Sequence, residues 1–138
     1  MLALQGTLTL RDVQGLHGGH DVWIAADGTA HVRTVDRGFE KRFKGTVPID
    51  DLQALLAKHD LKKIRIPDRP GVPDEARPTL IRRTDKDVVK VAKWAGQKDA
   101  DFDAVYAWLL KRAEDVAKTP PLFDGRWDPA WKPEGFSD

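Results

Sequence analysis

The stretch FDAVYAWLLKRAEDVA, residues 102–117, decides the fold of this 138-residue chain. Its apolar residues recur three and four positions apart, which places them along one side of a helix. They are Phe102, Val105, Tyr106, Leu109, Ala113, Val116 and Ala117. Asp99, Asp101 and Asp103 stand at its start, where carboxylates cap free N–H groups and meet the positive end of the helix dipole. A stripe this wide must pack on another layer, and the upstream stretches have the pattern of a β-sheet.

A predicted hairpin turns at Ala26-Asp27-Gly28, between strand-like stretches at 21–25 and 29–35. A three-residue loop with Gly28 in the left-handed conformation gathers the apolar side chains on one face. In that register Val22 pairs with Val32, Ile24 with Ala30, Asp21 with Arg33 and Trp23 with His31. A two-residue turn would mix apolar and polar residues on each face. We therefore expect the three-residue loop, with Trp23, His31 and Arg33 on the far face, partly exposed to solvent.

The rest of the pattern supplies further strands and one shorter helix. Strands are expected over 7–11, over 79–83 and over 88–94, and a helix over 49–59. Phe39 and Phe43 suggest that a further strand segment continues to about Thr46. Segment 62–66 is expected to be a brief strand or an extended connector. The sequence thus predicts an α+β fold, an antiparallel sheet of four to five strands with two helices packed on one face. The expected order is strand, strand, strand, helix, strand, strand, helix.

The chain divides into a body and an extension. Residues 1–118 are expected to form a single α+β domain with one core. Residues 119–138 hold four prolines and several aromatics, including Trp127 and Trp131, with no helical or strand period. Because aromatic side chains are rarely left in solvent, we expect this C-terminal tail to pack on the domain or on a partner.

Composition excludes several classes of protein. Lys and Arg number 23 and Asp and Glu number 22, a net charge of +1, so nucleic-acid binding is not expected. There is no cysteine, hence no disulfide framework and no thiolate metal site. No apolar run has the length of a membrane span, and we expect a cytoplasmic protein with no membrane partner.

Two histidines, His17 and His20, form the first candidate site. With a carboxylate from Asp21, Asp74 or Glu75 they would supply ligands for zinc. The alternative is a glycine-rich loop whose histidines bind backbone groups or face water. The register above places His31 on the face opposite His20, so His31 is not expected to join them.

The second candidate site is the proline-rich segment 69–78, which presents Asp74, Glu75 and Arg77 from a stiff frame. Stiff loops with charged residues are common binding sites. The alternative is an internal salt bridge, with Arg77 holding Asp74 or Glu75.

Catalytic signatures are missing from the sequence. Ser137 is the single serine, no threonine stands in a nucleophile elbow, and no glycine-rich phosphate loop is present. We therefore expect a non-catalytic protein without a cofactor.

Several motifs resemble those of a group of uncharacterised small bacterial proteins, roughly from Thr7 to Ala113. They are Gly18-Gly19-His20, Trp23, Ala26-Asp27-Gly28, segment 69–78, Lys93-Trp94-Ala95 and segment 101–106. That resemblance implies no activity. The order of elements is also similar to that of emfourin, a proteinaceous inhibitor of protealysin-type metallopeptidases, through a diglycine after the first strand and a leucine-rich helix after the third. The second resemblance implies an inhibitory function as a hypothesis.

We therefore expect a non-catalytic protein-binding module of an inhibitor-like or regulatory kind. Its candidate binding residues are His17, His20, Asp74, Glu75, Arg77, Trp127 and Trp131. The alternative is a small metal-binding protein or metal-dependent enzyme that uses the His17 and His20 loop.

Overall fold

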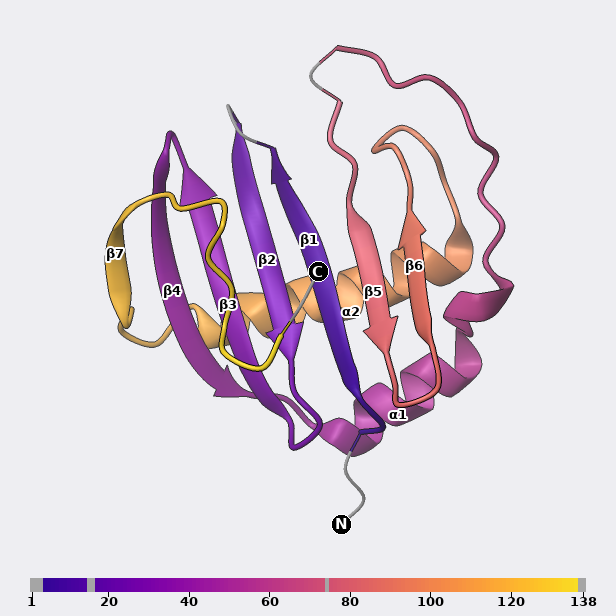
Figure 1. Ribbon diagram of the computed structural model, residues 1–138, viewed down its shortest axis with the longest axis horizontal. Helices are drawn as coiled ribbons and strands as arrows, with labels where there is room; N and C mark the ends of the chain where they lie inside the picture. The colour runs from indigo at the N-terminus through magenta and orange to yellow at the C-terminus, as the bar shows by residue number, and fades with distance from the viewer. Residues whose placement is uncertain (1–3, 15–16, 74, 137–138) are drawn as a thin grey trace.

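The computed structural model describes residues 4–14, 17–73 and 75–136. Within these residues the chain forms a seven-stranded sheet in the order β6-β5-β1-β2-β3-β4-β7, and each neighbouring pair of strands is antiparallel (Figure 1). The strands are β1 (Thr7–Gln14), β2 (Gly18–Ile24), β3 (Thr29–Asp36), β4 (Phe39–Thr46), β5 (Thr79–Arg83), β6 (Val88–Ala92) and β7 (Phe123–Arg126).

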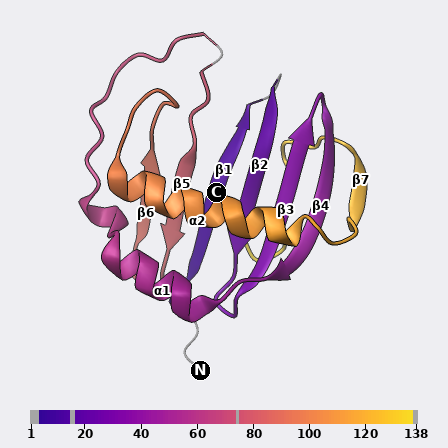
Figure 2. The same cartoon turned by 180° about the vertical axis from the view of Figure 1, so that it is seen from behind.

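Two α-helices of the described chain cover the same face of this sheet, so the expected α+β class is confirmed. They are α1 (Ile49–Lys58) and α2 (Ala100–Val116), and a short 3-10 helix, η1 (Leu61–Lys63), follows α1. Figure 2 shows α2 crossing the strands and α1 lying along one end of the sheet. As expected, an aspartate caps α2: the Asp99 side chain accepts a hydrogen bond from the backbone N–H of Phe102. No helix in the parts of the chain described here is long and apolar enough to cross a membrane.

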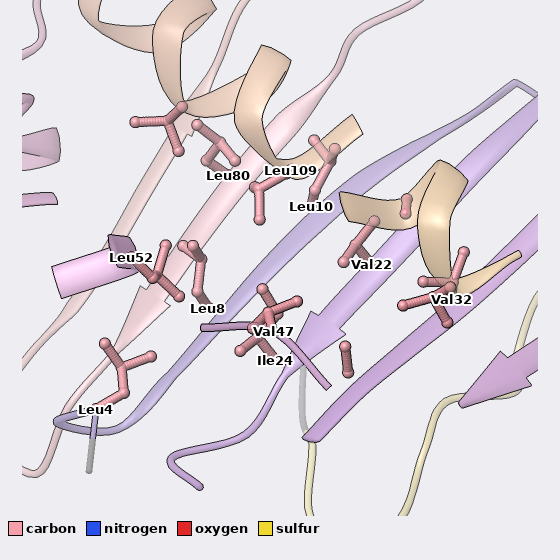
Figure 3. Close-up of a cluster of buried hydrophobic side chains, with 14 of the residues drawn as sticks. Leu4, Leu8, Leu10, Val22, Ile24, Val32, Val47, Leu52, Leu80 and Leu109 are labelled. Carbon is pink, nitrogen blue, oxygen red and sulfur yellow. The ribbon is translucent and has the colours of Figure 1, made fainter. Parts of the chain in front are cut away.

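The core lies between the sheet and α2 (Figure 3). Leu8, Leu10, Val22 and Ile24 point from β1 and β2 toward the helices, because alternate residues of a strand share a face. The predicted stripe of α2 faces them: Phe102, Val105, Leu109 and Ala113 are all buried. Burial of apolar surface on both layers is the main term that holds the helix to the sheet.

The hairpin between β2 and β3 has the expected register. Val22 pairs with Val32 and Ile24 with Ala30, and Gly28 has φ +92°, in the left-handed region. A Cβ atom added at Gly28 would lie 3.0 Å from both the Val47 carbonyl oxygen and Ile49 Cγ1. Both the backbone conformation and the space therefore require glycine at this position.

The predicted number and order of strands were wrong in two places. Four strands, not three, precede α1, because β3 and β4 join through a tight turn with positive φ at Arg37 and Gly38 (+52° and +83°). In addition, the tail contains a strand where none was expected: β7 pairs with β4 at the edge of the sheet. Segment 62–66, for which a brief strand or connector was expected, begins inside η1 and continues without a strand.

The tail runs across the face of the sheet opposite the helices (Figure 1). Trp131 contacts Trp23 edge to face, with 5.5 Å between the ring centroids. As a result Trp23 is 1% exposed and Arg33 is 0% exposed, so the expectation that they face solvent in part was wrong. His31, which lies half-buried on the same face, contacts the ring of Phe136. The helices therefore cover one face of the sheet, and the tail covers the part of the other face that β2, β3 and β4 form (Figure 1).

Candidate functional site

The candidate site is the proline loop, which we define as residues 67–78. It follows η1, extends beyond the end of the sheet and returns to β5 (Figure 1). Prolines fix φ and remove donors, so this segment cannot join the sheet as a ladder strand and needs other contacts to hold its shape. Those contacts come from the connection between β6 and α2, which lies beside it.

Several hydrogen bonds join the proline loop to that connection. The indole Nε1–H of Trp94 donates to the Arg69 carbonyl oxygen at 2.9 Å, and the Gln97 side-chain Nε2 donates to the Pro67 carbonyl oxygen at 2.6 Å. A backbone bond runs from the N–H of Ala95 to the carbonyl oxygen of Ala76, also at 2.9 Å. The loop is therefore fixed to the body near both of its ends.

An ion pair closes the loop on itself. Two guanidinium nitrogens of Arg69 donate to the two carboxylate oxygens of Glu75, at 2.9 and 2.7 Å, which is the strong bidentate geometry. The same carboxylate accepts from the backbone N–H of Gly96 at 2.9 Å and of Val72 at 3.3 Å. We call Arg69, Glu75, Trp94 and Gln97 the clamp.

These donors also set the charge of Glu75. The hydrogen bonds from Arg69, followed by the bond from Gly96, lower the pKa of Glu75 to about 2. In return, the carboxylate raises the pKa of Arg69. Glu75 is thus ionised throughout the neutral range and holds the loop together; a proton-transfer role would need a pKa nearer neutrality.

Arg77 has a different partner from the one the sequence favoured. Glu75 pairs with Arg69, and the Arg77 guanidinium lies over the ring of Trp94, 4.6 Å from the ring centroid. Asp74, the other expected partner, lies outside the described residues. Gly71 approaches the same indole so closely that an added Cβ atom would lie 2.4 Å from Trp94 Cη2. The loop therefore packs around the Trp94 indole.

The tip of the proline loop is apolar and exposed. Pro70, Gly71, Val72 and Pro73 are all exposed, and the Val72 side chain is 61% exposed. An exposed valine on a mobile loop would be unremarkable, but here the clamp fixes the backbone on either side of it. The loop therefore presents a small apolar surface on a backbone that the clamp holds in place.

Replacing Arg69 by methionine should raise the pKa of Glu75 from about 2 toward its ordinary 4.5, because the strongest donors to the carboxylate are removed. The lowered pKa means that the ionised clamp stabilises the folded loop fully above about pH 4.5 and loses this contribution as the pH falls toward 2. Carboxyl-carbon NMR across this range measures the pKa directly. The control is Arg65→Met, because Arg65 donates to the carbonyl oxygens of Lys62 and Ile64. An unchanged Glu75 pKa in Arg69→Met would contradict this account of the clamp.

The two histidines of the first candidate site lie in different surroundings. His17 lies in an exposed turn. His20 is half-buried on the helix-covered face, where its Nε2 is 3.3 Å from the Tyr106 hydroxyl and 3.7 Å from Asp12 Oδ2. As expected from the register, His31 lies on the opposite face. Among the residues that the structure describes, no three His, Asp or Glu side chains gather as a metal-ligating group.

His20, Asp12 and Tyr106 form a small polar cluster at the edge of the core. The Tyr106 hydroxyl donates to Asp12 in a short hydrogen bond. Burial is the main reason that the pKa values of both Asp12 and Tyr106 are raised, although the tyrosine and His20 partly oppose the shift at Asp12. This cluster was not predicted, because Tyr106 on α2 is distant in sequence from Asp12 on β1 and His20 on β2.

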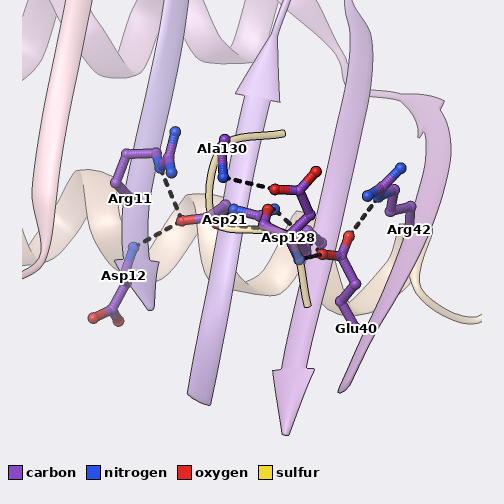
Figure 4. A network of polar contacts seen from close by, with 8 residues as sticks. Arg11, Asp12, Asp21, Glu40, Arg42, Asp128 and Ala130 are labelled. Carbon is purple, nitrogen blue, oxygen red and sulfur yellow. Dashed lines mark hydrogen bonds and ion pairs between the residues drawn. The ribbon is translucent and has the colours of Figure 1, made fainter. Parts of the chain in front are cut away.

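A buried polar network lies beneath the tail (Figure 4). At its centre the Arg33 guanidinium lies between two buried carboxylates, 2.8 Å from Asp21 and 3.5 Å from Glu40. Arg33 also donates to the Asp128 carbonyl oxygen at 2.8 Å, and the Asp128 backbone N–H donates to Glu40 at 2.6 Å. The tail backbone thus completes the hydrogen bonding of charges that belong to the sheet.

The tail aromatics cover this network. The Arg42 guanidinium, which also pairs with Glu40, lies 4.0 Å from the Trp131 ring centroid. Trp127 is half-buried, and its indole N–H has no hydrogen-bond partner among the described residues. In this arrangement the Trp131 ring packs against Trp23 and Arg42 of the same chain.

Deletion of the residues after Lys118 should lower the melting temperature and cost about 1–3 kcal/mol of stability. The loss comes from exposing Trp23 and the buried charges, and the entropy regained by the freed tail offsets part of it. Thermal unfolding followed by circular dichroism measures the change. Trp131→Ala should reproduce much of the loss without shortening the chain. A truncated protein that melts like the full chain but no longer self-associates or binds a partner would contradict this prediction.

Three clamp residues, Arg69, Trp94 and Gln97, were not among the predicted site residues. Arg69 and Glu75 carry opposite charges six positions apart in one proline-rich loop, and that signal could have identified the pair. Nothing in the sequence places Trp94 and Gln97 beside the loop, because the contact depends on the fold. Neither family models, nor curated protein sequences, nor solved structures give a match to this chain.

Proposed function

We propose that this protein is a non-catalytic protein-binding module that contacts its partner through the tip of the proline loop. The observation that carries the proposal is the combination of an exposed Val72 with a clamp on either side of it. A loop that is ordered before it meets its partner is typical of recognition surfaces.

The clamp reduces the conformational entropy that the loop would lose on binding a partner. Fixing one residue of a flexible loop costs about 1–2 kcal/mol, and a loop that is already fixed does not incur this cost on binding. The Arg69–Glu75 pair and the Trp94 indole hold the loop in the free protein. The contacts of the tip with a partner then contribute to affinity without being offset by the cost of ordering the loop.

The chemistry of the tip indicates the kind of partner surface. Pro70 and Pro73 have no N–H to donate, so the loop is poorly suited to adding a strand to a partner's sheet. Recognition would instead use insertion of the Val72 side chain into a small apolar pocket, with the proline rings covering its rim. Arg77, exposed beside the tip, would provide a polar contact at the edge.

Site-specific photo-crosslinking tests the proposal in cells that naturally express the protein. A benzophenone amino acid at position 72 should yield one discrete adduct with another protein. The matched control places the same probe at Val88, an exposed valine in the hairpin at the other end of β5. Equal labelling from both positions, or no adduct from position 72, would overturn the proposal.

The role of the clamp is tested with the partner that this adduct identifies. Val72→Asp should abolish binding, because a charge cannot enter an apolar pocket without a large desolvation cost. Arg69→Met leaves the tip intact but frees the loop, and should weaken binding about tenfold. Arg65→Met serves again as the control and should bind normally. If Arg69→Met bound as tightly as the unmodified protein, an ordered loop would not be the basis of recognition.

A further inference from the structure

A cleft of about 540 Å³ lies between α1, η1 and the β5–β6 hairpin. This hairpin turns at the opposite end of β5 from the proline loop (Figure 1). The volume of the cleft is within the range of about 300–1,000 Å³ that sites for small molecules occupy. Leu56, Leu61 and Val89 contribute apolar surface to its wall, and Arg82 contributes a positive charge. It shares no residue with the proline loop or with the tail.

Arg82 occupies a position where the fold calls for an apolar side chain. Its neighbours across the sheet are Leu8 on β1 and Val89 on β6. Leu80, two residues earlier on the same strand, is fully buried in the core. Because alternate residues of a strand share a face, Arg82 lies on the helix-covered face. A charged group there is costly unless something binds it.

Within the described residues nothing binds this guanidinium. Arg82 makes no hydrogen bond or ion pair with any residue that the structure describes, and its Nη1 atom is buried without an acceptor. Burial lowers the pKa of Arg82, and no carboxylate acts on that pKa in the opposite direction. The group remains a cation, since even a lowered arginine pKa lies far above neutrality.

The two acidic residues of the cleft have other partners. Asp87 pairs with the Lys62 ammonium at 2.9 Å. Asp60 accepts the backbone N–H of Lys62 at 3.0 Å and so caps the start of η1. The charges of Lys62 and Asp87 offset one another, and Asp60 accepts the N–H group that it caps. Among the described residues, Arg82 is therefore left as the cation of the cleft without a hydrogen bond or ion pair.

We propose that this cleft binds a small monocarboxylate with an apolar body, of the kind of a medium-chain fatty acid. The carboxylate would accept hydrogen bonds from the Arg82 guanidinium, and the chain would lie along Leu56, Leu61 and Val89. The single negative charge of a carboxylate matches Arg82, which in the described part of the chain is the cation of the cleft without a partner. A phosphate would carry further negative charge toward Asp60 and Asp87, and the described residues that line the cleft offer no second unpaired cation to balance it.

Isothermal titration calorimetry with octanoate tests this proposal. The unmodified protein should show saturable binding to one site, and Arg82→Met should weaken it about tenfold or more. Arg83→Met is the matched control, because it removes a charge from the other face of the same strand, and it should bind octanoate normally. Melting temperatures verify that the variants are folded, and Arg82→Gln replaces Arg82→Met if the latter does not fold.

Three further ligands test separately the need for a charge, for an alkyl chain and for a single rather than a double negative charge. 1-Octanol has the chain without the charge and acetate has the charge without the chain, so each should bind about tenfold or more weakly than octanoate. Octyl phosphate should also bind more weakly. The proposal is overturned if octanoate does not saturate, if the Arg82 variant binds it as tightly as the unmodified protein, or if octyl phosphate binds more tightly than octanoate.

Discussion

Replacing Arg33 by methionine is expected to destabilise the protein by about 3 kcal/mol or more, because it leaves two buried carboxylates without their central counter-charge. Asp21 and Glu40 lie on either side of this guanidinium, and all three side chains are almost fully buried. Arg11 and Arg42 still pair with the two acids from the edge of the network, which limits the loss. Urea unfolding of the variant measures the change.

Arg11→Met is the control for this variant. Arg11 pairs with the same Asp21 but its side chain is partly exposed, so its removal should cost about 1 kcal/mol or less. A second test removes the charges of the three buried side chains together, with Arg33→Met, Asp21→Asn and Glu40→Gln. Because the cost arises from uncompensated charge, the triple variant should regain part of the stability that Arg33→Met loses. If Arg33→Met unfolds at the same urea concentration as the unmodified protein, the network does not stabilise the outer face.

Leu109→Ala is expected to cost about 2–5 kcal/mol, the usual range for removing a buried leucine side chain from a core. Leu109 is 0% exposed at the middle of α2 and packs toward the sheet, where Leu10 and Leu80 lie (Figure 3). The sheet cannot collapse into the space left behind, since its strands are held in register on both sides. Thermal or urea unfolding gives the difference in free energy.

Lys111→Ala is the comparison for the helix stripe. It lies on the exposed side of α2, where truncation should change stability by about 0.5 kcal/mol or less. The contrast between the two variants tests which side of the helix faces the sheet. An unchanged midpoint for Leu109→Ala would mean that the helix does not pack as the structure places it.

Local patterns were sufficient to predict the parts of the fold that depend on neighbouring residues. The stripe on α2 follows from its helical spacing, and the register of the β2–β3 hairpin follows from the one loop that sorts apolar from polar residues. In both cases the correct structure is the one that buries the most apolar surface within a short segment.

Contacts between distant segments could not be predicted in the same way. The strand β7 has four residues and a central glycine, so its pattern is too short to identify, and its pairing with β4 depends on the path of the tail. For the same reason Trp23 was expected to be partly exposed. In the proline loop an ion pair was predicted and is present, but Arg69 and Arg77 both stand near enough to Glu75 in the sequence to form it.

The hydrogen bond from Arg33 to the Asp128 carbonyl oxygen joins residues 95 positions apart, and this separation bears on how the protein is made. The chain leaves the ribosome from its N-terminal side, so β2 and β3, which carry Trp23 and Arg33, emerge before the tail. Trp23 and the charges around Arg33 then have no cover, because Asp128 and Trp131 have not yet emerged. We expect the outer face to be completed last. Until then it is the surface that a chaperone would recognise and on which nascent chains would aggregate.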